Sequence, residues 1–293
     1  MIMKNKVLIL VALCLMISGA VSAHSNVFVN QKLEVMGIAG SPWETETSYE
    51  EERARAYLDA LNHAYEQIIN LPLMDKKEVK HIVQSNRAFK ERIGFLLLTS
   101  PKTFYQTDLN GINRCKIEVD LSGKNSLRST FYLAAMRPQP MQPVSFLASW
   151  SAGIEIDKNA EPSKYKRVVV DARKSYFEPS LFPRFFDRKG VLVFQEAMIP
   201  ETERFSRPAV RFVTTIEKAR EGLPASQIFT ADSIIDELHP RDVVINPTDI
   251  TEFAIFCNDI VKTPLKEREI VIVFKPDNFK EYGKMKKTEE KKE

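Results

Sequence analysis

The sequence predicts an α+β protein. Its first half is expected to pack an amphipathic helix on an antiparallel sheet, and its second half to form a mixed, β-rich sheet with one or two helices. Apolar residues recur in steps of three and four between Ser48 and Pro72, which is the spacing of one helix face. Segments that alternate or are continuously apolar precede and follow this helix, which is typical of strands.

The helix predicted from Ser48 to Leu71 organises the first half. Ser48 followed by Glu51 has the form of a capping box, in which the hydroxyl accepts from a first-turn amide and the glutamate reaches back. Asn70 and Pro72 mark its end. The side chains expected on its inward face are Ala54, Tyr57, Leu58, Leu61, Ala64, Tyr65, Ile68 and Ile69.

Weaker patterns lie on both sides of this helix. Leu33 to Gly40 alternates like a strand, and its glycines are expected to turn the chain toward the helix. Met74 to Gly94 predicts a second helix that ends at its glycine, with Asp75 and Glu78 as a cap pair. Its expected inward residues are Val79, Ile82, Val83, Phe89 and Ile93.

A hairpin is predicted next. Thr103 to Asp108 and Asn113 to Leu121 read as strands on either side of an Asn-Gly turn. In the returning strand the charged residues Lys116, Glu118 and Asp120 alternate with apolar ones. One face of the sheet is therefore expected to be exposed to solvent or bound to a partner. Leu127 to Ala135 suits either a strand or a helix.

The second half is predicted to be β-rich. Three consecutive valines indicate a strand buried on both faces, and Gly190 suits the left-handed position of a hairpin turn. Asn, Pro and Asp before the last helix have the chemistry of a helix start. The expected elements are a strand at Lys166 to Ala172, a hairpin from Phe185 to Phe194, a strand at Asp242 to Ile245, a helix at Thr248 to Val261 and a strand at Glu269 to Phe274.

The amino-terminal segment predicts export. Lys4 and Lys6 precede an apolar run of about 11 residues, which is shorter than the roughly 20 that span a bilayer as a helix. Small residues then end at Ala23, so residues 1–23 read as a signal peptide cleaved after Ala23 and the chain is expected in the periplasm. The alternative is an uncleaved anchor; in the mature chain no transmembrane segment is expected.

The domain organisation follows from composition. Three prolines between Arg137 and Pro143 indicate a linker at residues 138–145, with an ordinary loop as the alternative. This divides the chain into an N-terminal α+β domain at 24–137 and a C-terminal β-rich α+β domain at 146–275. Residues 276–293 are highly charged and predict a disordered tail.

Charge and cysteine content exclude several classes. The net charge is +3 with two lysines in the leader, and such a near-neutral body does not favour nucleic acid as a partner. Cys115 and Cys257 both lie on apolar faces, so two separate buried thiols are preferred over a disulfide, which the expected compartment would permit.

No pattern of catalytic chemistry is present. The histidines, His24, His63, His81 and His239, have no second histidine or cysteine at metal-ligand spacing. The sequence lacks a nucleophile elbow and a phosphate-binding loop, and Gly37-Ile38-Ala39-Gly40 is not a dinucleotide fingerprint. We therefore expect neither an enzyme nor a metal or cofactor site.

The most distinctive segment runs from Asp171 to Gly190, where aromatic rings alternate with arginines. Such a segment can form an exposed surface for a partner or ligand. The alternative, which we favour, is a rigid loop packed through its prolines, with Asp171 paired to an arginine. The residues of the possible surface are Tyr176, Phe177, Phe182, Arg184 and Phe185.

Several segments together resemble a known group. Leu33 to Gly40, followed by Glu52-Arg53-Ala54-Arg55-Ala56-Tyr57-Leu58-Asp59-Ala60-Leu61, resembles the start of bacterial envelope proteins of the twenty-kilodalton lipoprotein family and the N-terminal domain of flagellar assembly protein T. Val168 to Arg173, Pro179 to Arg184, Asp187 to Gly190 and Asp242 to Ile272 look like the core of larger exported relatives. The lipid-bearing cysteine of that family is missing here.

This resemblance implies a non-catalytic role in the envelope. We expect a periplasmic structural or assembly protein, as a component of a ring or disk around the flagellar motor. Its expected partners are other envelope or flagellar-motor proteins and further copies of itself. The alternative function is a periplasmic module that binds a cell-wall or lipid ligand through the aromatic loop 176–186.

Overall fold

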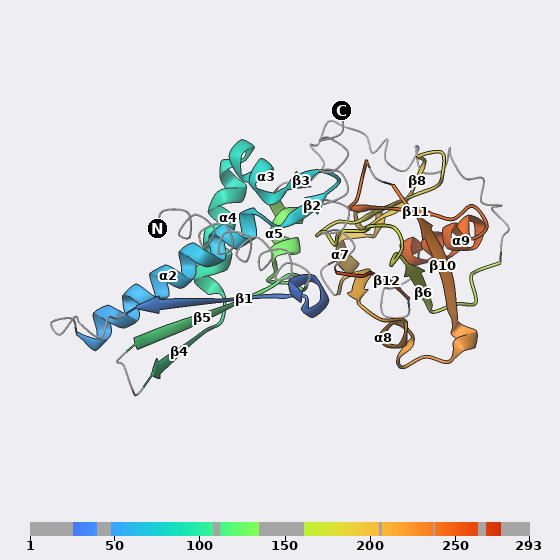
Figure 1. The fold of residues 1–293 in the computed structure, drawn as a ribbon. Coiled ribbons are helices and arrows are strands. Elements are labelled where there is room, and N and C mark those ends of the chain that lie inside the picture. Colours follow the sequence, from blue (N-terminus) through green and yellow to red (C-terminus); the bar gives the residue numbers. More distant parts are fainter. Residues whose placement is uncertain are drawn as a thin grey trace, which may run out of the picture.

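The computed structural model describes residues 26–39, 48–107, 112–134, 161–204, 207–236, 238–262 and 268–276. Each half of the chain has its own main sheet, and the two halves lie side by side (Figure 1). Helices pack on an antiparallel sheet in the first half, and the second half holds a mixed sheet with a helix, so the predicted α+β class is confirmed.

Some sequence-based expectations lie outside the described residues. These are the leader at 1–23, the Asn-Gly turn of the first hairpin, the linker at 138–145 and nearly all of the tail at 276–293. Within the residues that the structure describes, no helix is both long enough and apolar enough to cross a membrane.

The first half contains a three-stranded antiparallel sheet. β1 (Lys32–Ala39) pairs with β5 (Ile112–Asp120), and β5 pairs with β4 (Lys102–Thr107), in the order β1-β5-β4. Burial alternates strictly along β1, as it does along β5 through Cys115, Ile117 and Val119. The predicted strands are confirmed. Among the described residues, the side chains on the face opposite α2 are exposed or partly exposed, and this is the open face of the sheet.

The predicted long helix is α2 (Tyr49–Ile69), which runs along this sheet (Figure 1). Its capping box is formed as expected. Ser48 Oγ accepts a hydrogen bond from the amide of Glu51 at 3.3 Å, and Glu51 Oε2 accepts from the amide of Ser48 at 3.1 Å. Asn70 is its C-cap.

The inward face of α2 differs from the prediction. The fully buried residues follow a strict spacing of four and are Ala56, Ala60, Ala64 and Ile68. Ala54 is exposed, and Leu58 is 59% exposed. Hydrophobic periodicity favours large apolar side chains, whereas the short distance between α2 and the sheet requires small ones at this contact.

Gly37 in β1 sets this distance. A Cβ atom at Gly37 would lie 2.2 Å from Ala56 O and 2.2 Å from Ala60 N, both backbone atoms of α2. The expectation that this glycine turns the chain is therefore wrong. It lies within the strand, where the missing side chain lets the helix backbone touch the sheet.

The predicted second helix is divided. Pro72–Met74 (β2) and Lys77–Glu78 (β3) form a short hairpin, followed by α3 (Val79–Ser85) and α4 (Arg87–Thr99). Asn86 has an extended backbone, which ends α3. Its side chain accepts a hydrogen bond from the amide of Phe89 at 3.0 Å and so caps the start of α4. Gly94 lies inside α4 and does not end it. The segment after the sheet is a helix, α5 (Leu127–Ala134).

The second half contains a seven-stranded mixed sheet in the order β8-β7-β11-β10-β6-β12-β9. The predicted central strand, β6, lies between β10 and β12 and is parallel to both. The predicted hairpin is also confirmed, with Gly190 at φ +80°. The strands are Arg167–Asp171 (β6), Arg184–Phe186 (β7), Leu192–Gln195 (β8), Val210–Val213 (β9), Ile228–Ile234 (β10), Asp242–Ile245 (β11) and Glu269–Val273 (β12).

Both faces of this sheet are covered. Val168 and Val170 belong to the main core, which includes residues of α9 (Ile250–Lys262), whereas Val169 joins a smaller cluster with Ala219 of α8 (Ile216–Arg220). Short helical segments complete the half at Glu196–Met198 (η1), Glu201–Arg204 (α7) and Ala225–Gln227 (η2).

The start of α9 lies later than predicted. Asn246 Oδ1 accepts a hydrogen bond from the amide of Thr248 at 3.3 Å. This hydrogen bond closes a turn before the helix, and the helix itself begins at Ile250. Asp249 Oδ2 accepts the amide of Asp232 in β10 at 2.9 Å, so this carboxylate ties the helix to the sheet.

Two cysteines, Cys115 of β5 and Cys257 of α9, are free and buried. Burial raises the pKa of both thiols, and for Cys115 the nearby Lys102 and Arg53 oppose this effect. The prediction of two separate buried thiols is confirmed.

One hydrophobic core joins the two halves. Phe28, which precedes β1, meets Phe212 of β9 with ring centroids 5.7 Å apart. Phe131 of α5 meets Phe182 of the second half at 5.5 Å. The halves therefore share buried apolar surface in the described part of the chain.

The contact at Gly37 gives a stability prediction. Gly37→Ala forces a Cβ atom into the backbone of α2, so we expect a loss of about 3 kcal/mol in the free energy of unfolding. Urea denaturation followed by circular dichroism measures it. The matched control is Gly94→Ala in α4, where the added Cβ meets nothing within 4 Å and better helix propensity adds about 0.5–1 kcal/mol. Equal stability of both variants would contradict the close contact.

Candidate functional site

The aromatic loop predicted as a possible surface is mostly interior. Phe177, Phe182 and Phe185 are 3%, 4% and 0% exposed. Tyr176 is partly buried and adopts a left-handed backbone with φ +52°. These rings therefore belong to the packed loop that the sequence favoured, and three of the five proposed surface residues are not accessible to a ligand.

The first half holds this loop in place. The amides of Leu181 and Phe182 donate to the carbonyl oxygens of Pro72 and Leu73 in β2, each at 2.9 Å. Tyr132 of α5 adds an edge contact to the ring of Phe182 at 5.3 Å. The β2–β3 hairpin thus holds the loop by two backbone hydrogen bonds.

Arg184, the fourth proposed surface residue, has a partner in the neighbouring strand. Its Nε and terminal nitrogen donate to the two carboxylate oxygens of Asp242 at 2.9 and 2.5 Å. The parallel register of β7 and β11 places these two residues directly opposite each other. Burial raises the pKa of the Asp242 carboxyl, and the hydrogen bonds from Arg184 oppose that rise.

The expected pairing of Asp171 with an arginine is present, but it is local. Arg173 donates to both carboxylate oxygens of Asp171, at 2.8 and 2.6 Å. The Arg173 side chain is 45% exposed. Hydrogen bonding from Arg173 lowers the pKa of Asp171. This pair stiffens the turn after β6 and does not cross the loop.

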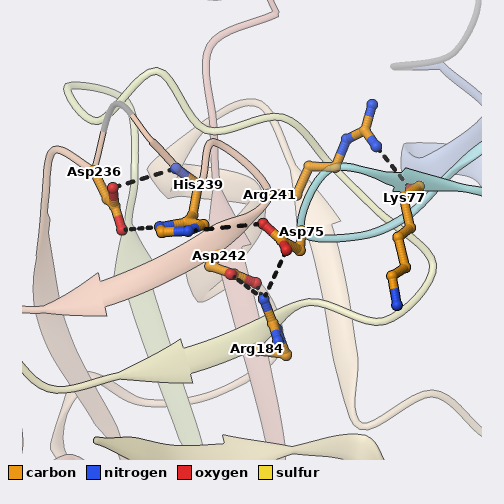
Figure 2. A network of polar contacts seen from close by, with 7 residues as sticks. All are labelled: Asp75, Lys77, Arg184, Asp236, His239, Arg241 and Asp242. Carbon is orange, nitrogen blue, oxygen red and sulfur yellow. Dashed lines mark hydrogen bonds and ion pairs between the residues drawn. The ribbon is translucent and has the colours of Figure 1, made fainter. Parts of the chain in front are cut away.

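A polar cluster surrounds the Arg184–Asp242 pair at the junction of the halves (Figure 2). Asp75, in the β2–β3 turn with φ +49°, approaches Arg184 at 3.9 Å and His239 Nε2 at 4.0 Å. His239 Nδ1 lies 3.1 Å from Asp236 Oδ2. His239 is therefore placed between carboxylates from the two halves of the chain.

A second arginine ties the same junction. Arg241 Nε donates to Glu178 Oε2 at 2.7 Å, and another of its nitrogens donates to the carbonyl oxygen of Lys77 in β3 at 2.8 Å. The residue that follows it is Asp242 of β11. Neighbouring positions at the start of one strand therefore bind both the loop and the first half.

The cluster borders a pocket of about 280 Å³. Most of its lining residues are charged or polar, although apolar atoms contribute much of the exposed lining; the lining residues are Arg184, Phe186, Asp187, Arg188, Gly190, Asp236, His239, Asp242 and Val244. Among the residues that the structure describes, no group of three or more histidine, cysteine or acidic side chains is arranged to hold a metal ion.

A buried ion pair forms another link between the halves. Arg128 of α5 lies 3.7 Å from Glu196 of η1, with side chains only 4% and 2% exposed. Arg204 of α7 stacks over the ring of Tyr132 at 5.0 Å. Burial raises the pKa of the Tyr132 hydroxyl well above its usual value. These contacts connect α5 to the second half through its polar side chains.

The open face of the first sheet is the other candidate surface. Its side chains include three exposed large apolar residues, namely Met36 at 39%, Ile38 at 53% and Tyr105 at 45%. Around them, Lys32, Glu34, Lys116 and Glu118 form ion pairs. The prediction that Lys116, Glu118 and Asp120 point away from the core is confirmed.

Sequence reasoning missed the junction cluster. The sequence places no second histidine or cysteine at metal-ligand spacing from His239, but Asp236 lies three residues before it and contacts it. That spacing was the only signal in the sequence. Asp75 and Asp242 come from elements far apart in the chain, so their approach follows from the packing of the halves.

The comparison with protein families concerns the second half. Residues 167–276 match the family described as Treponema pallidum Tp0624, second domain. The match begins with β6 and ends after β12, so it spans the whole seven-stranded sheet. A search of curated proteins finds no match. The resemblance to the twenty-kilodalton lipoprotein family and to flagellar assembly protein T stays a prediction.

The two Asp–Arg pairs give a matched prediction. Asp242→Asn breaks the paired contact between β7 and β11 and leaves Arg184 without its carboxylate, so we expect a loss of about 2 kcal/mol in the free energy of unfolding. Asp171→Asn breaks the exposed local pair and costs about 0.5 kcal/mol. Because the pKa of Asp171 is lowered, its smaller contribution is present above the usual carboxyl pKa and is lost as pH falls. Chemical denaturation at neutral and acidic pH measures both; a larger loss in Asp171→Asn would contradict the assignment.

Proposed function

We propose that this chain is an exported, non-catalytic structural or assembly protein of the cell envelope, which acts in the periplasm through contacts with other proteins. The charged and apolar leader supports export. The observation that carries the assembly role is the open face of the first sheet, which exposes large apolar side chains on a half whose core is otherwise well packed.

The arrangement of this face supports protein binding. Ile38, Arg114 and Tyr105 lie opposite one another across the three strands, and Met36 lies two residues from Ile38 on the same face. Apolar side chains gathered on one face and bordered by charged ones are typical of protein interaction sites. The ion pairs between Lys32, Lys116 and Glu118 give this border a fixed charge pattern.

We further propose a role in an accessory ring or disk of the flagellar motor, with the chain as a homo-oligomer. The support is the resemblance of Leu33 to Gly40 and Glu52 to Leu61 to flagellar assembly protein T and the twenty-kilodalton lipoproteins. These two segments form β1 and part of α2, which are the elements that Gly37 holds together. Contacts between different surfaces of successive copies would close a ring.

Export is tested by locating the chain in cell fractions. The wild-type chain is expected in the periplasm with a mature amino terminus at His24, because cleavage follows Ala23. Leu10→Arg places a charge in the apolar core of the leader and is expected to leave the chain in the cytoplasm. Amino-terminal sequencing and fractionation give the result. A wild-type chain that stays in the cytoplasm would refute the proposed location.

The assembly role is tested by mutating the open face. Ile38→Glu is expected to reduce the yield of cross-linked complexes in cells about tenfold, since it removes an apolar contact and adds a charge. Leu58→Glu is the matched control, because Leu58 is 59% exposed on α2, away from this face.

Both variants are expected to keep the wild-type unfolding midpoint. Imaging the envelope of wild-type, deletion and Ile38→Glu cells then tests the flagellar part. An unchanged motor in the deletion strain would contradict the flagellar role. Unchanged cross-linking in Ile38→Glu would contradict the role of the open face.

A second candidate function is binding of a small polar cell-wall ligand at the junction pocket. The observation that favours it is the pocket of about 280 Å³ beside Arg184 and Phe186, at the end of the loop 176–186. The charged groups of Arg184, Asp187, Arg188 and Asp236 in its lining suit a polar fragment that also has apolar parts. Calorimetric titration with a soluble muropeptide tests it, with Arg188→Ala in the pocket wall as the variant expected to weaken binding. No heat of binding at millimolar ligand would exclude this function.

A further inference from the structure

The two outer edges of the first sheet differ. Hydrogen bonds across an antiparallel ladder alternate, so every second residue of an edge strand points its amide and carbonyl away from the sheet. On β1 these outward groups include the amide of Ile38, which donates to Asp59 Oδ2 of α2 at 2.9 Å. His63 Nδ1 lies 3.4 Å from the carbonyl oxygen of Met36 on the same edge. α2 thus covers this edge.

Among the residues that the structure describes, no element covers the edge at β4. The amide of Glu118 donates to the carbonyl oxygen of Pro101, so by alternation Thr103 and Tyr105 bond to β5, whereas Lys102 and Phe104 point their backbone groups outward. Within the described residues, no hydrogen bond reaches the outward groups of Lys102 or Phe104. Lys102, Thr103 and Tyr105 are also exposed.

Apart from Lys102 at its start, the sequence of β4 does not protect this edge. Natural edge strands are usually blocked by proline, by several charges, by a bulge or by a covering segment. Thr103-Phe104-Tyr105-Gln106-Thr107 contains no proline and no charge, and most of its residues favour strands. Its register with β5 is regular over six residue pairs, without a bulge. Such an edge is suited to pair with one more strand.

The charge beside this edge selects the partner. Arg53 of α2 lies over the ring of Phe104 at 4.2 Å, and Lys102 Nζ lies 4.5 Å from the ring of Tyr57. Neither cation has a carboxylate partner among the described residues. Both belong to the helix-covered side of the sheet, because Lys102 and Phe104 face α2. A strand added here would therefore place every second side chain near two unpaired positive charges.

We propose that the β4 edge binds an extended acidic segment of a partner protein, which adds a fourth strand to the sheet. Acidic side chains at alternate positions of that segment would pair with Lys102 and Arg53, and the residues between them would pack beside Thr103 and Tyr105. This proposal deepens the assembly function and rests on it. A second copy is less favoured, since antiparallel pairing of two β4 strands would bring two Arg53 side chains together.

Peptide binding tests the edge directly. The probe is the acetylated, amidated peptide Thr-Glu-Thr-Glu-Thr-Glu-Thr, and the control peptide has lysine at each glutamate. Amide hydrogen exchange is measured on the full chain by NMR. We expect the acidic peptide to slow exchange at Lys102 and Phe104 about tenfold or more, with little change at Thr103 and Tyr105, which are already bonded. The lysine peptide is expected to have no effect.

Charge reversal gives the second arm. Arg53→Glu is expected to weaken binding of the acidic peptide about tenfold, whereas Lys189→Glu, an equal charge change in the second half, leaves it unchanged. Three results would overturn the proposal: no protection at millimolar peptide, equal binding of the lysine peptide, or the same protection at high protein concentration without peptide. The last result would assign the edge to a second copy.

A cross-linking experiment separates this inference from the assembly function. A photoreactive residue at Thr103 is expected to capture a partner protein in cells, and an acidic segment of that partner is expected at the cross-link. If complexes form only through Ile38 on the open face, the assembly function stands and the β4 edge does not. If the peptide binds in solution but neither position captures a partner in cells, the edge stands and the assembly function does not.

Discussion

The first half depends on the close approach of α2 to β1. Gly37 leaves no room for a Cβ atom, since Ala56 O and Ala60 N lie where one would be. The alanines at Ala56, Ala60 and Ala64 bury completely because only small side chains fit this distance. The same approach brings Asp59 within hydrogen-bond distance of the edge of β1, so one contact both forms the core and closes one edge of the sheet.

The second constraint is the set of contacts that joins the two halves at the loop before β7. Backbone groups of the β2 strand bind the loop at Leu181 and Phe182, and the ring of Phe131 packs on Phe182. This buries a loop that would otherwise expose several aromatic rings in one place. At its rim Arg184 and Asp242 bind each other, and both line a small pocket. The surface that we propose for protein contact is the first sheet, whose open face exposes Met36, Ile38 and Tyr105.

Much of the fold could be predicted from the sequence. The capping box at Ser48, the buried strand at Val168 to Val170 and the left-handed Gly190 were all identified from neighbouring residues. The errors share a cause. Asn86 ends a helix, and Asp249 binds the amide of Asp232 instead of serving only its own helix. A periodic pattern reports which residues are apolar, but it does not report which small or polar residue a neighbouring element requires.

The sequence by itself determined the capping box of α2, the buried strand β6 and the turn at Gly190, because these depend on hydrogen bonds and spacings within a few neighbouring residues. Only the tertiary structure decided which face of α2 is buried, that Phe177, Phe182 and Phe185 are interior, and that His239 lies between Asp236 and Asp75. The difference is physical. Burial and charge pairing depend on segments that are distant in the chain, and their free energies appear only when packing brings those segments together.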